Sequence, residues 1–270
     1  MSKRIEWHIA DGVAHAQLAR PEKINAVDMA MFEALVAVPA QLRAEPQLRC
    51  VVLSGHGRGF CAGLDTGAFA QMASDPDTVA RLLSRYPGSE ANRAQQAVYG
   101  WAQLPVPVIA AVHGVCFGAG LQLALAADLR IVSAGAQLSV MEIKWGLVPD
   151  MTGVQALQRL VRADVAKELT YTGRRVGGEE AVVLGLATRV AEDPVAAALA
   201  LAQDIAQRSP DAIRAAKKLL DQSARLPFPQ ALALEAALQR QLIGGANQME
   251  AVMSNMQKRA PRFIDPPKPR

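Results

Sequence analysis

The chain has 270 residues, of which 51% are apolar and 20% carry a formal charge. This length and composition fit one large domain, or a domain with a smaller appendage, and exclude a disordered or fibrous protein. The net charge of +4 comes from scattered basic residues, and no arginine-aromatic interleaving marks a nucleic-acid-binding face. The charge therefore suits an anionic small ligand at least as well as a polymer.

The cysteines and the N-terminal segment indicate the cellular compartment. Cys50, Cys61 and Cys116 are odd in number, have no metal-ligand spacing and lie in apolar contexts. We therefore expect reduced core thiols and no metal site. Met1 to Arg4 is not followed by the apolar run of a secretory signal, because Glu6 interrupts it. These features predict a cytoplasmic protein.

Strands and helices alternate at the beginning of the chain. Apolar and polar residues alternate from Ile5 to Leu18 around Asp11-Gly12, which predicts a β-hairpin. We expect Asp28 to cap a helix over 29–43, and the apolar run 50–54 to form a strand buried on both faces. This alternation predicts an α/β fold.

The stretch from Val106 to Ala127 carries no formally charged side chain and is long enough for a membrane span. Prolines at 105 and 107 and glycines at 114, 118 and 120 exclude a continuous spanning helix. We expect a buried strand over 108–112, a glycine turn, and a buried helix over about 119–127. The glycine order matches neither a dinucleotide fingerprint nor a P-loop, but unpaired N–H groups at such a helix start can hold an oxyanion.

Two further segments before this stretch are informative. The loop from Gly55 to Asp65 is rich in glycine, so its backbone can approach a ligand closely. Asp65 is placed to cap the next helix or to hold the loop. The long insertion from Phe69 to Leu104 has breaks at Pro76 and Pro87-Gly88, and inserts of this kind form lids or pocket walls.

After Asp193 the composition changes to helices rich in Ala, Leu and Gln, and no further strand is expected. We divide the chain into a core, 1–192, and a C-terminal helical oligomerisation region, 193–270. Apolar stripes on its helices suit packing against a neighbouring subunit, and the tail is expected to be loose after Phe263. The later expected elements are helices over 152–160, 163–170, 178–184, 194–208, 211–224 and 229–257 and a strand over 188–191.

Five motifs, taken together, resemble one known family. The chain carries, in this order, RPEKINA, GRGFCAGLD, PVIAAVHGVCFGAGLQLALAADLRI, EIKWGLVPD and LTYTGRRVGGEEAVVLGLATRV. In sequence and order these resemble the crotonase, or enoyl-CoA hydratase/isomerase, superfamily, in register from Ile5 to Phe263. The resemblance implies an α/β fold, a crotonase-type spiral of ββα units that binds an acyl-CoA thioester, with a C-terminal helical region that builds trimers, often paired into hexamers.

The resemblance also implies an oxyanion hole made of main-chain groups. The N–H groups of Leu64 and Ala119 match the two donors that hold the thioester oxygen as it becomes an enolate. Ala62, Gly63 and Gly118 flank these donors at the substrate. Such donors act mainly when negative charge develops, and one is typically worth about 3 kcal/mol of barrier.

The acid/base positions of the family transfer only in part. Enoyl-CoA hydratases have a glutamate where this chain has Gln122, whose amide cannot exchange a proton at neutral pH. Their second glutamate matches Glu142. Asp150 matches an aspartate of dienoyl-CoA isomerases and of 4-chlorobenzoyl-CoA dehalogenases, but the dehalogenases place a tryptophan at the Glu142 position. The pattern therefore is most similar to dienoyl-CoA isomerases, although those carry an aspartate at the Gln122 position.

We expect a double-bond shift in an enoyl- or dienoyl-CoA through a stabilised enolate. Glu142 would move the proton, Asp150 would supply a second proton site for a diene, and Gln122 would orient the acyl chain or a water. A slow hydratase lacking the first glutamate is the second reading, and a non-catalytic acyl-CoA- or RNA-binding protein is the third. Each residue also has a structural alternative: Glu142 as a surface carboxylate, Asp150 as a helix cap, Gln122 as packing.

The remaining candidates concern the CoA moiety and the assembly. Lys23, Arg58 and Lys258 are candidate partners for CoA phosphates, and Asp65 is a candidate at the substrate loop. Phe263 resembles the family's aromatic near the adenine of an adjacent subunit. We expect no cofactor beyond the CoA moiety of the substrate, a homotrimer or hexamer, and no membrane or nucleic-acid partner.

Overall fold

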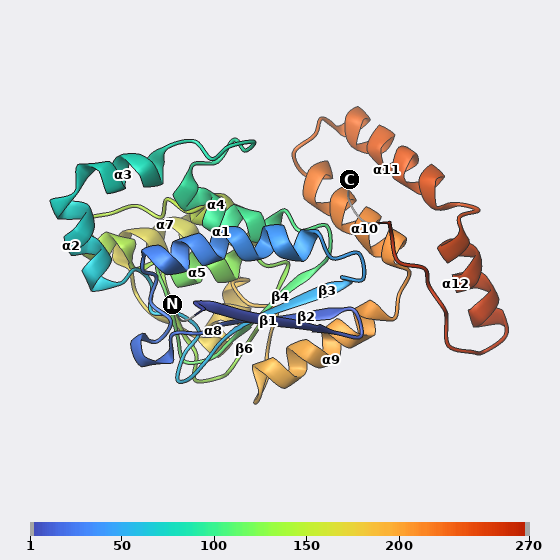
Figure 1. The fold of residues 1–270 in the computed structure, drawn as a ribbon, viewed down its shortest axis with the longest axis horizontal. Helices are drawn as coiled ribbons and strands as arrows, with labels where there is room; N and C mark the ends of the chain where they lie inside the picture. The colour runs from blue at the N-terminus through green and yellow to red at the C-terminus, as the bar shows by residue number, and fades with distance from the viewer. Residues whose placement is uncertain (1–2, 268–270) are drawn as a thin grey trace.

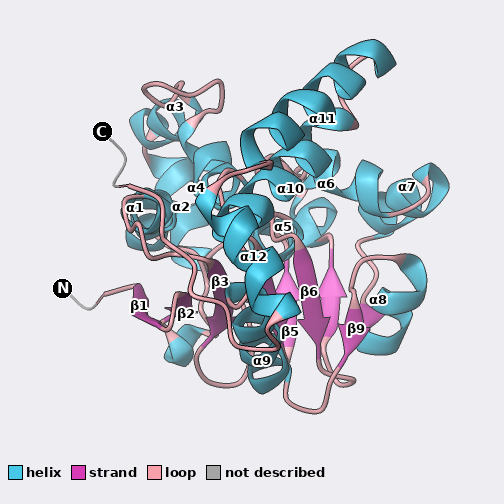
Figure 2. Ribbon diagram, turned by 90° about the vertical axis from the view of Figure 1, so that its right-hand side faces the viewer, coloured by secondary structure: helices cyan, strands magenta, loops and turns pink. Residues whose placement is uncertain are grey.

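A six-stranded sheet forms the centre of the molecule in the computed structural model, which describes residues 3–267 (Figure 1). Its strand order is β1-β2-β3-β4-β6-β9, and Figure 2 shows the strands from β1 at one edge to β9 at the other. β1 and β2 pair antiparallel, and the other neighbours pair parallel. The strands are β1 (Ile5–Ala10), β2 (Val13–Leu18), β3 (Cys50–Gly55), β4 (Val108–Val112), β6 (Leu129–Val132) and β9 (Arg189–Val190).

The predicted hairpin and the first helix are confirmed. Asp11 and Gly12 have φ values of 49° and 79°, the left-handed values that a two-residue turn between β1 and β2 requires. α1 (Met29–Arg43) begins at Asp28, whose carboxylate accepts from Met31 N at 2.8 Å. The strand expected over 50–54 is β3, and all six of its residues are buried.

A second, three-stranded sheet stands beside the first, in the order β5-β7-β8. It contains β5 (Val115–Phe117), β7 (Gln137–Ser139) and β8 (Val176–Gly177). The chain goes from β4 in the large sheet to β5 in the small one, and then from β6 to β7 in the same way, which produces the turns of a spiral. We did not predict β5, β6, β7 or β8, because strands of two to four residues are too short to show periodicity.

Helices cover both faces of the large sheet (Figure 1). α1 and α4 (Arg93–Ala102) pack together on one side, where Trp101 is fully buried and donates from Nε1 to Leu35 O at 3.1 Å. The insertion breaks where it was expected to, but α4 belongs to the core, so only the part before it can act as a lid or pocket wall. The buried face of α4 was not predicted, because polar residues separate the small apolar residues Ala94, Ala97 and Val98 that form it.

α9 (Pro194–Ala206) covers the other face of the sheet. Ala198, Ala202 and Ala206 lie buried in a second apolar cluster with Val13, Val52 and Ile109 of the strands. α9 therefore packs with the sheet rather than with the later helices. The division at residues 192 and 193 stays a prediction.

The C-terminal region differs from the prediction in two places. The helix expected over 229–257 is interrupted by Gly244 and Gly245, with Gly244 at φ 76°, a conformation that ends α11 (Phe228–Leu242) before α12 (Ala246–Met256). The tail expected to be loose after Phe263 is bound at its start. Ile264 N donates to Asn247 Oδ1 at 2.8 Å, and Asp265 pairs with Arg49 at 2.8 Å. Residues 268–270 lie outside the described residues.

The remaining helices are η1 (Pro21–Lys23), α2 (Thr66–Ser74), α3 (Pro76–Leu83), α5 (Ala119–Leu125), η2 (Met141–Trp145), α6 (Gly153–Leu160), α7 (Ala163–Thr172), α8 (Gly178–Leu184) and α10 (Pro210–Ser223). Among them, α5, α6, α7, α8 and α10 agree with the predicted bounds to within two residues, whereas η1 and η2 were not predicted as helices. The three cysteines are buried and free as expected. No helix within residues 3–267 has the length and apolar character needed to cross a bilayer.

Candidate active site

Two loops, residues 61–65 and 117–120, lie against each other at the start of α5; we call them the donor loops. Cys61 N donates to Val115 O, and Phe117 N donates to Cys61 O, each at 3.0 Å. A Cβ added to Gly63 would lie 2.9 Å from Phe117 O and 3.9 Å from Ala119 N. This spacing leaves no room for a side chain at Gly63, whose φ is also +93°.

The N–H groups of Leu64 and Ala119 are available in the donor loops, whereas their neighbours are occupied. Gly118 N donates to Ser139 O at 3.0 Å, and Asp65 N donates to Val27 O at 2.9 Å. Within the described residues, Leu64 N–H donates to no backbone carbonyl, and Ala119 N–H is the first of α5 and so lacks an intrahelical acceptor. The structure thus brings both predicted donors together with Ala62, Gly63 and Gly118.

Glu142 lies on η2 beside the donor loops. It is 9% exposed, and a Cβ added to Gly118 would lie 3.4 Å from its Oε1. Oε1 accepts from Gln122 Nε2 at 2.6 Å, whereas Oε2 is buried and has no hydrogen-bond partner within the part of the chain that the structure describes. Burial excludes the alternative of a surface carboxylate beside Lys144.

The pKa of Glu142 is raised above its ordinary value. Burial is the largest cause, and the negative charge of Asp150 acts in the same direction. The hydrogen bond from Gln122 opposes this shift, because it stabilises the ionised form. A buried carboxyl with one free oxygen and a raised pKa is suited to accept and return a proton near neutral pH.

Gln122 uses both polar atoms of its side chain on the protein. Its Oε1 accepts from Met151 N at 2.8 Å and from Gly153 N at 3.0 Å, while its Nε2 donates to Glu142. We had expected Gln122 to orient the acyl chain or a water, or to be inert packing. The structure instead places it between Glu142 and the turn that follows Asp150.

Asp150 lies one residue before that turn. It is exposed on this chain, yet the protein around its carboxyl removes enough water to raise the pKa of Asp150 above its ordinary value. It does not cap α6, because the residue at the N-cap is Thr152, and Gly153 N is bound by Gln122 instead. The helix-cap alternative for Asp150 is therefore wrong.

Two residues that the sequence analysis missed hold the first donor loop. Arg20 Nη1 donates to Asp65 Oδ2 at 2.6 Å, and Asp65 Oδ1 accepts from Gly67 N at 2.7 Å. Asn25, fully buried, donates from Nδ2 to the carbonyl oxygens of residues 56, 59 and 60. Asp65 is therefore a partner of Arg20. The segment RPEKINA, which contains both Arg20 and Asn25, was the available signal.

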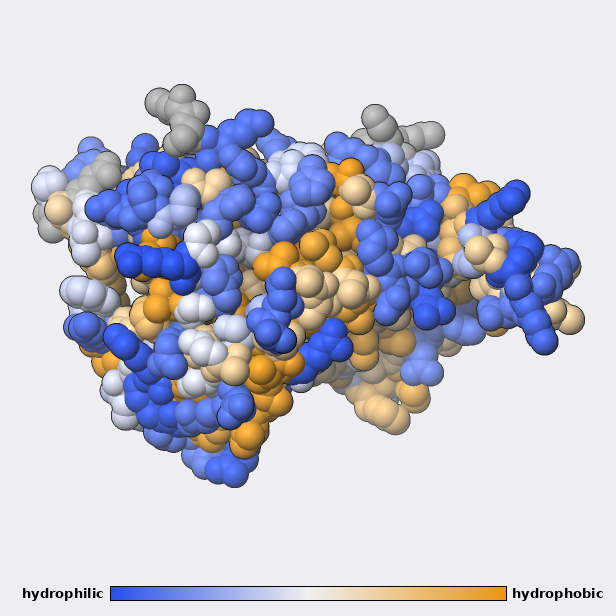
Figure 3. Space-filling model, turned by 90° about the horizontal axis from the view of Figure 1, so that it is seen from below, coloured by the Kyte–Doolittle hydropathy of each residue, from blue (hydrophilic) through white to orange (hydrophobic). Residues whose placement is uncertain are grey.

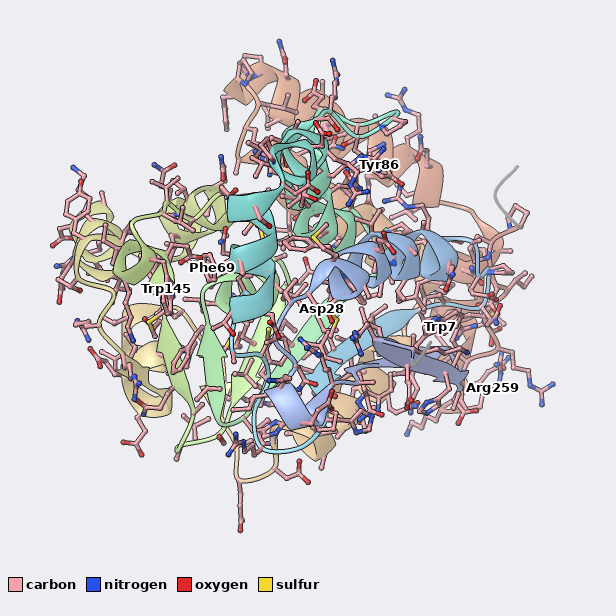
Figure 4. The ribbon with its side chains drawn as sticks, turned by 60° about the vertical axis from the view of Figure 1, so that its left-hand side comes forward. Trp7, Asp28, Phe69, Tyr86, Trp145 and Arg259 are labelled. Carbon is pink, nitrogen blue, oxygen red and sulfur yellow. The ribbon has the colours of Figure 1, made fainter. Side chains whose placement is uncertain are left out.

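An aromatic pair joins the two sides of the site. Phe69 of α2 and Trp145 of η2 have ring centroids 5.3 Å apart and point toward one another (Figure 4). Trp145 remains 52% exposed, so the pair forms part of the outer wall. A separate surface hollow of about 480 Å³, lined by residues 85–90, shares no residue with the site.

The candidate CoA contacts are only partly near the site. Lys23 is exposed and close enough to Asp65 for its charge to act on that carboxyl. Burial raises the pKa of Asp65, but hydrogen bonds from Gly67 and Arg20, followed by the charges of Arg20 and Lys23, lower it below its ordinary value. Arg58 is exposed on the same glycine-rich segment. Lys258 and Phe263 follow α12, which lies at the end of the molecule opposite α2 and α3 (Figure 1), and Phe263 O accepts from Arg49 Nη2 at 3.4 Å. One chain therefore does not bring them to Glu142.

Known proteins show similarity over almost the whole chain. The family model described as Enoyl-CoA hydratase/isomerase matches residues 8–266. The mouse mitochondrial enoyl-CoA hydratase domain-containing protein 2 is 35% identical over 260 residues, covering 94% of this chain and 84% of that protein. The mouse mitochondrial Delta(3,5)-Delta(2,4)-dienoyl-CoA isomerase is 32% identical over 258 residues, covering 93% and 79%.

A crystal structure agrees with these sequence matches. The enoyl-CoA hydratase from Bacillus anthracis superposes with a TM-score of 0.88 at 30% identity, covering 96% of this chain and 98% of the other. The fold is therefore that of the crotonases, as the resemblance predicted. This chain belongs to the enoyl-CoA hydratase/isomerase family. Its relatives carry both the hydratase and the isomerase name.

Proposed function

We propose that the protein is an isomerase that shifts double bonds in an enoyl- or dienoyl-CoA. One observation carries this proposal: Glu142 offers a free buried oxygen, while the position of the first hydratase glutamate holds Gln122, whose Oε1 is occupied by two backbone N–H groups. Proton transfer needs one carboxyl with a free oxygen. Delivery of water by a carboxylate pair needs two.

In the proposed reaction Glu142 Oε2 removes a proton from carbon 2 of the acyl chain. The negative charge moves onto the thioester oxygen, where the N–H groups of Leu64 and Ala119 stabilise it as an enolate. A proton then returns at carbon 4 of a 3-enoyl substrate, or at carbon 6 of a 3,5-dienoyl substrate, where Asp150 is the proposed second proton site. Substrate and product have the same composition, so we propose no cofactor beyond the CoA moiety.

Incubation in heavy water tests the proposal. The purified protein is mixed with a trans-3-enoyl-CoA or a 3,5-dienoyl-CoA, and product mass and double-bond position are followed. We expect a conjugated product of unchanged composition, apart from exchanged deuterium. A trans-2-enoyl-CoA is tested in parallel, because hydration needs a double bond between carbons 2 and 3. A product from it that is heavier by one water supports the hydratase, the second candidate, which the names of the relatives at 35% and 30% identity favour. No product with any of the three substrates supports a non-catalytic binding protein.

We also propose a homotrimer or hexamer. Large apolar side chains are exposed on the C-terminal helices, including Phe228 at 74% and Met256 at 76%. Figure 3, seen from below, shows apolar residues interspersed with polar ones on the right-hand half of the molecule, the half in which Figure 1 places α12. In such an assembly Lys258 and Phe263 would contact the CoA of an adjacent subunit. Light scattering of the purified protein measures the assembly, and a monomer at micromolar concentration contradicts it.

The cytoplasmic location remains a proposal as well. It is supported by the free, buried state of Cys50, Cys61 and Cys116, which form no disulfide within the described chain. Fractionation of the cells that make the protein tests it, and recovery with membranes or in an organelle contradicts it.

A further inference from the structure

Gln122 connects the Glu142 carboxyl to the turn that follows Asp150 through three hydrogen bonds. One bond goes to Glu142 Oε1, and the other two come from the backbone of Met151 and Gly153, the residues that follow Asp150. The side chain is 4% exposed, so protein groups replace water at each of these atoms. No other residue of the site contacts both Glu142 and the turn after Asp150 among the hydrogen bonds of residues 3–267.

The two backbone bonds fix which way the amide of Gln122 faces. Oε1 must accept from Met151 N and Gly153 N, because both are donors, and Nε2 must then face Glu142. Nε2 is a donor only, so Glu142 Oε1 must be its acceptor. When Glu142 is protonated, its proton is therefore on Oε2, the buried oxygen without a partner in the described chain.

The turn held by Gln122 does not have a relaxed backbone. Thr152, between the two N–H donors, has φ 68° and ψ 7°, a left-handed conformation that a β-branched residue adopts only at a cost of about 1–3 kcal/mol. Such a conformation persists when surrounding contacts hold it. The close packing of Gly153, where a Cβ would lie 2.7 Å from Gln122 Oε1, shows how tightly the turn is held.

We propose that Gln122 is a positioning residue that fixes the proton-carrying oxygen of Glu142 and the place of Asp150 relative to it. Its Nε2 determines which oxygen of Glu142 carries the proton, and its Oε1 holds the turn that positions Asp150. One side chain therefore aligns both ends of a proton transfer. This inference rests on the proposed isomerase function for its kinetic consequence. The hydrogen bonds on which it is based are those of the protein without substrate.

The other charged groups near Glu142 do not hydrogen-bond to its carboxyl among the described residues, so Gln122 is the neutral group that sets its orientation. Asp150 is the group whose charge raises the pKa of Glu142, after the larger effect of burial. Lys144, on the same helix, has its Nζ over the Trp145 ring at 5.5 Å. On α7, which packs against η2, Glu168 pairs with Arg174 at 2.7 Å.

Two substitutions separate the two roles. Gln122→Glu keeps an oxygen that accepts from Met151 N and Gly153 N, but it replaces the donor to Glu142 by a carboxylate oxygen. Gln122→Met keeps the shape of the side chain and removes all three bonds. Gln137→Leu is the matched control, because Gln137 lies outside the site and its side chain donates only a 3.3 Å bond to Ala136 O within the described residues.

Infrared titration of the protein without substrate provides the first measurement. The carboxyl bands are assigned by their loss in Glu142→Gln and Asp150→Asn. We expect the Glu142 band to titrate at higher pH in both Gln122 variants, since the donor that lowers its pKa is gone, and the shift should be larger in Gln122→Glu, which adds a like charge beside Glu142. The Asp150 band should shift only in Gln122→Met, toward lower pH, because release of the turn exposes the carboxyl to water.

Turnover provides the second measurement. Both variants should lower kcat about 100-fold at neutral pH with little change in KM. The part of the pH profile in which kcat rises as Glu142 ionises should move to higher pH. Unchanged band positions in both variants, with only lower thermal stability, would show a structural role and overturn the proposal. The proposal would also be overturned if the Asp150 band shifted as far in Gln122→Glu as in Gln122→Met. If Gln122→Met does not fold, Gln122→Glu still decides through the Glu142 band.

These measurements distinguish the two proposals. The infrared titration needs no turnover, so shifted bands together with no product from either enoyl-CoA contradict the isomerase and leave the positioning role standing. Normal isomerisation with unshifted bands contradicts the positioning role and leaves the isomerase standing.

Discussion

The two sides of the site are built from different parts of the chain. The donor loops present main-chain N–H groups of Leu64 and Ala119, and their side chains have no direct part in the chemistry. The segment 142–153, which we call the carboxyl segment, presents the side chains of Glu142 and Asp150, and the amide of Gln122 on α5 contacts this segment. Substitution therefore affects the two sides differently, because main-chain groups are lost only when the backbone moves.

The largest effect is expected from Glu142→Gln, on the carboxyl segment. The amide cannot accept a proton, so kcat should fall about 1,000-fold while CoA affinity is unchanged. Steady-state kinetics and calorimetric CoA binding measure the two quantities. Glu168→Gln is the control, since Glu168 is an exposed partner of Arg174. Retained turnover, or loss of CoA binding together with turnover, contradicts the role of Glu142.

The second effect tests the donor loops through their backbone. Gly63→Ala forces a Cβ to within 2.9 Å of Phe117 O at a φ of +93°, so the loop must move. We expect kcat to fall about 100-fold, with a loss of about 1–3 kcal/mol in stability. Gly177→Ala is the control, because it has open space and an extended φ of −73°. Leu64→Ala should retain turnover, and equal losses in both loop variants would mean that side chains matter there.

The third effect separates the two carboxyls. Asp150→Asn should lower kcat for a 3,5-dienoyl-CoA about 10- to 100-fold and leave a 3-enoyl-CoA nearly unaffected, because only the longer proton transfer needs the distal site. Kinetics with both substrates on one preparation provide the measurement. A uniform loss with both substrates would make Asp150 a structural neighbour of Glu142.

A smaller effect is expected where a side chain supports a donor loop. Asp65→Asn weakens the 2.6 Å pair with Arg20 but keeps a group that can accept from Gly67 N. We expect kcat to fall about tenfold with little change in KM. Asp164→Asn is the matched control, since Asp164 forms an exposed pair with Arg162 far from the loops in sequence. A change in KM alone would indicate that Asp65 contacts substrate.

The smallest effect concerns stability and pH. The folded protein raises the pKa of Glu142 above its ordinary 4.5, mainly by burial. Wild-type stability linked to this group is thus present below that pH and is lost as pH rises through the raised value. Glu142→Gln should therefore be more stable than wild type by about 1–3 kcal/mol in alkaline solution and by less in acid. Urea unfolding at several pH values measures this, and a difference independent of pH contradicts it.

The comparison also explains what could be predicted from the sequence. The predictions of β3, α1 and α5 were confirmed, because apolar patterning and capping are local properties of the sequence. The short strands β5 to β8 were missed, since they exist only through pairing with distant segments. At the site, Glu142 and the donor positions came from motif resemblance. The hydrogen-bond partners of Gln122 and Asp65 could not be predicted, because a hydrogen bond between residues 20 or more positions apart leaves no local pattern in the sequence.

The alanine face of α9 bears on how far the chain can be shortened. Ala198, Ala202 and Ala206 cover strand residues that include Val52 and Ile109, so a protein ending at residue 192 would leave one face of the large sheet open to water. Such a truncation should aggregate, whereas one ending just after α9 retains that cover. The shortest segment with a chance of folding by itself therefore extends past Ala206, even though the strands end at Val190.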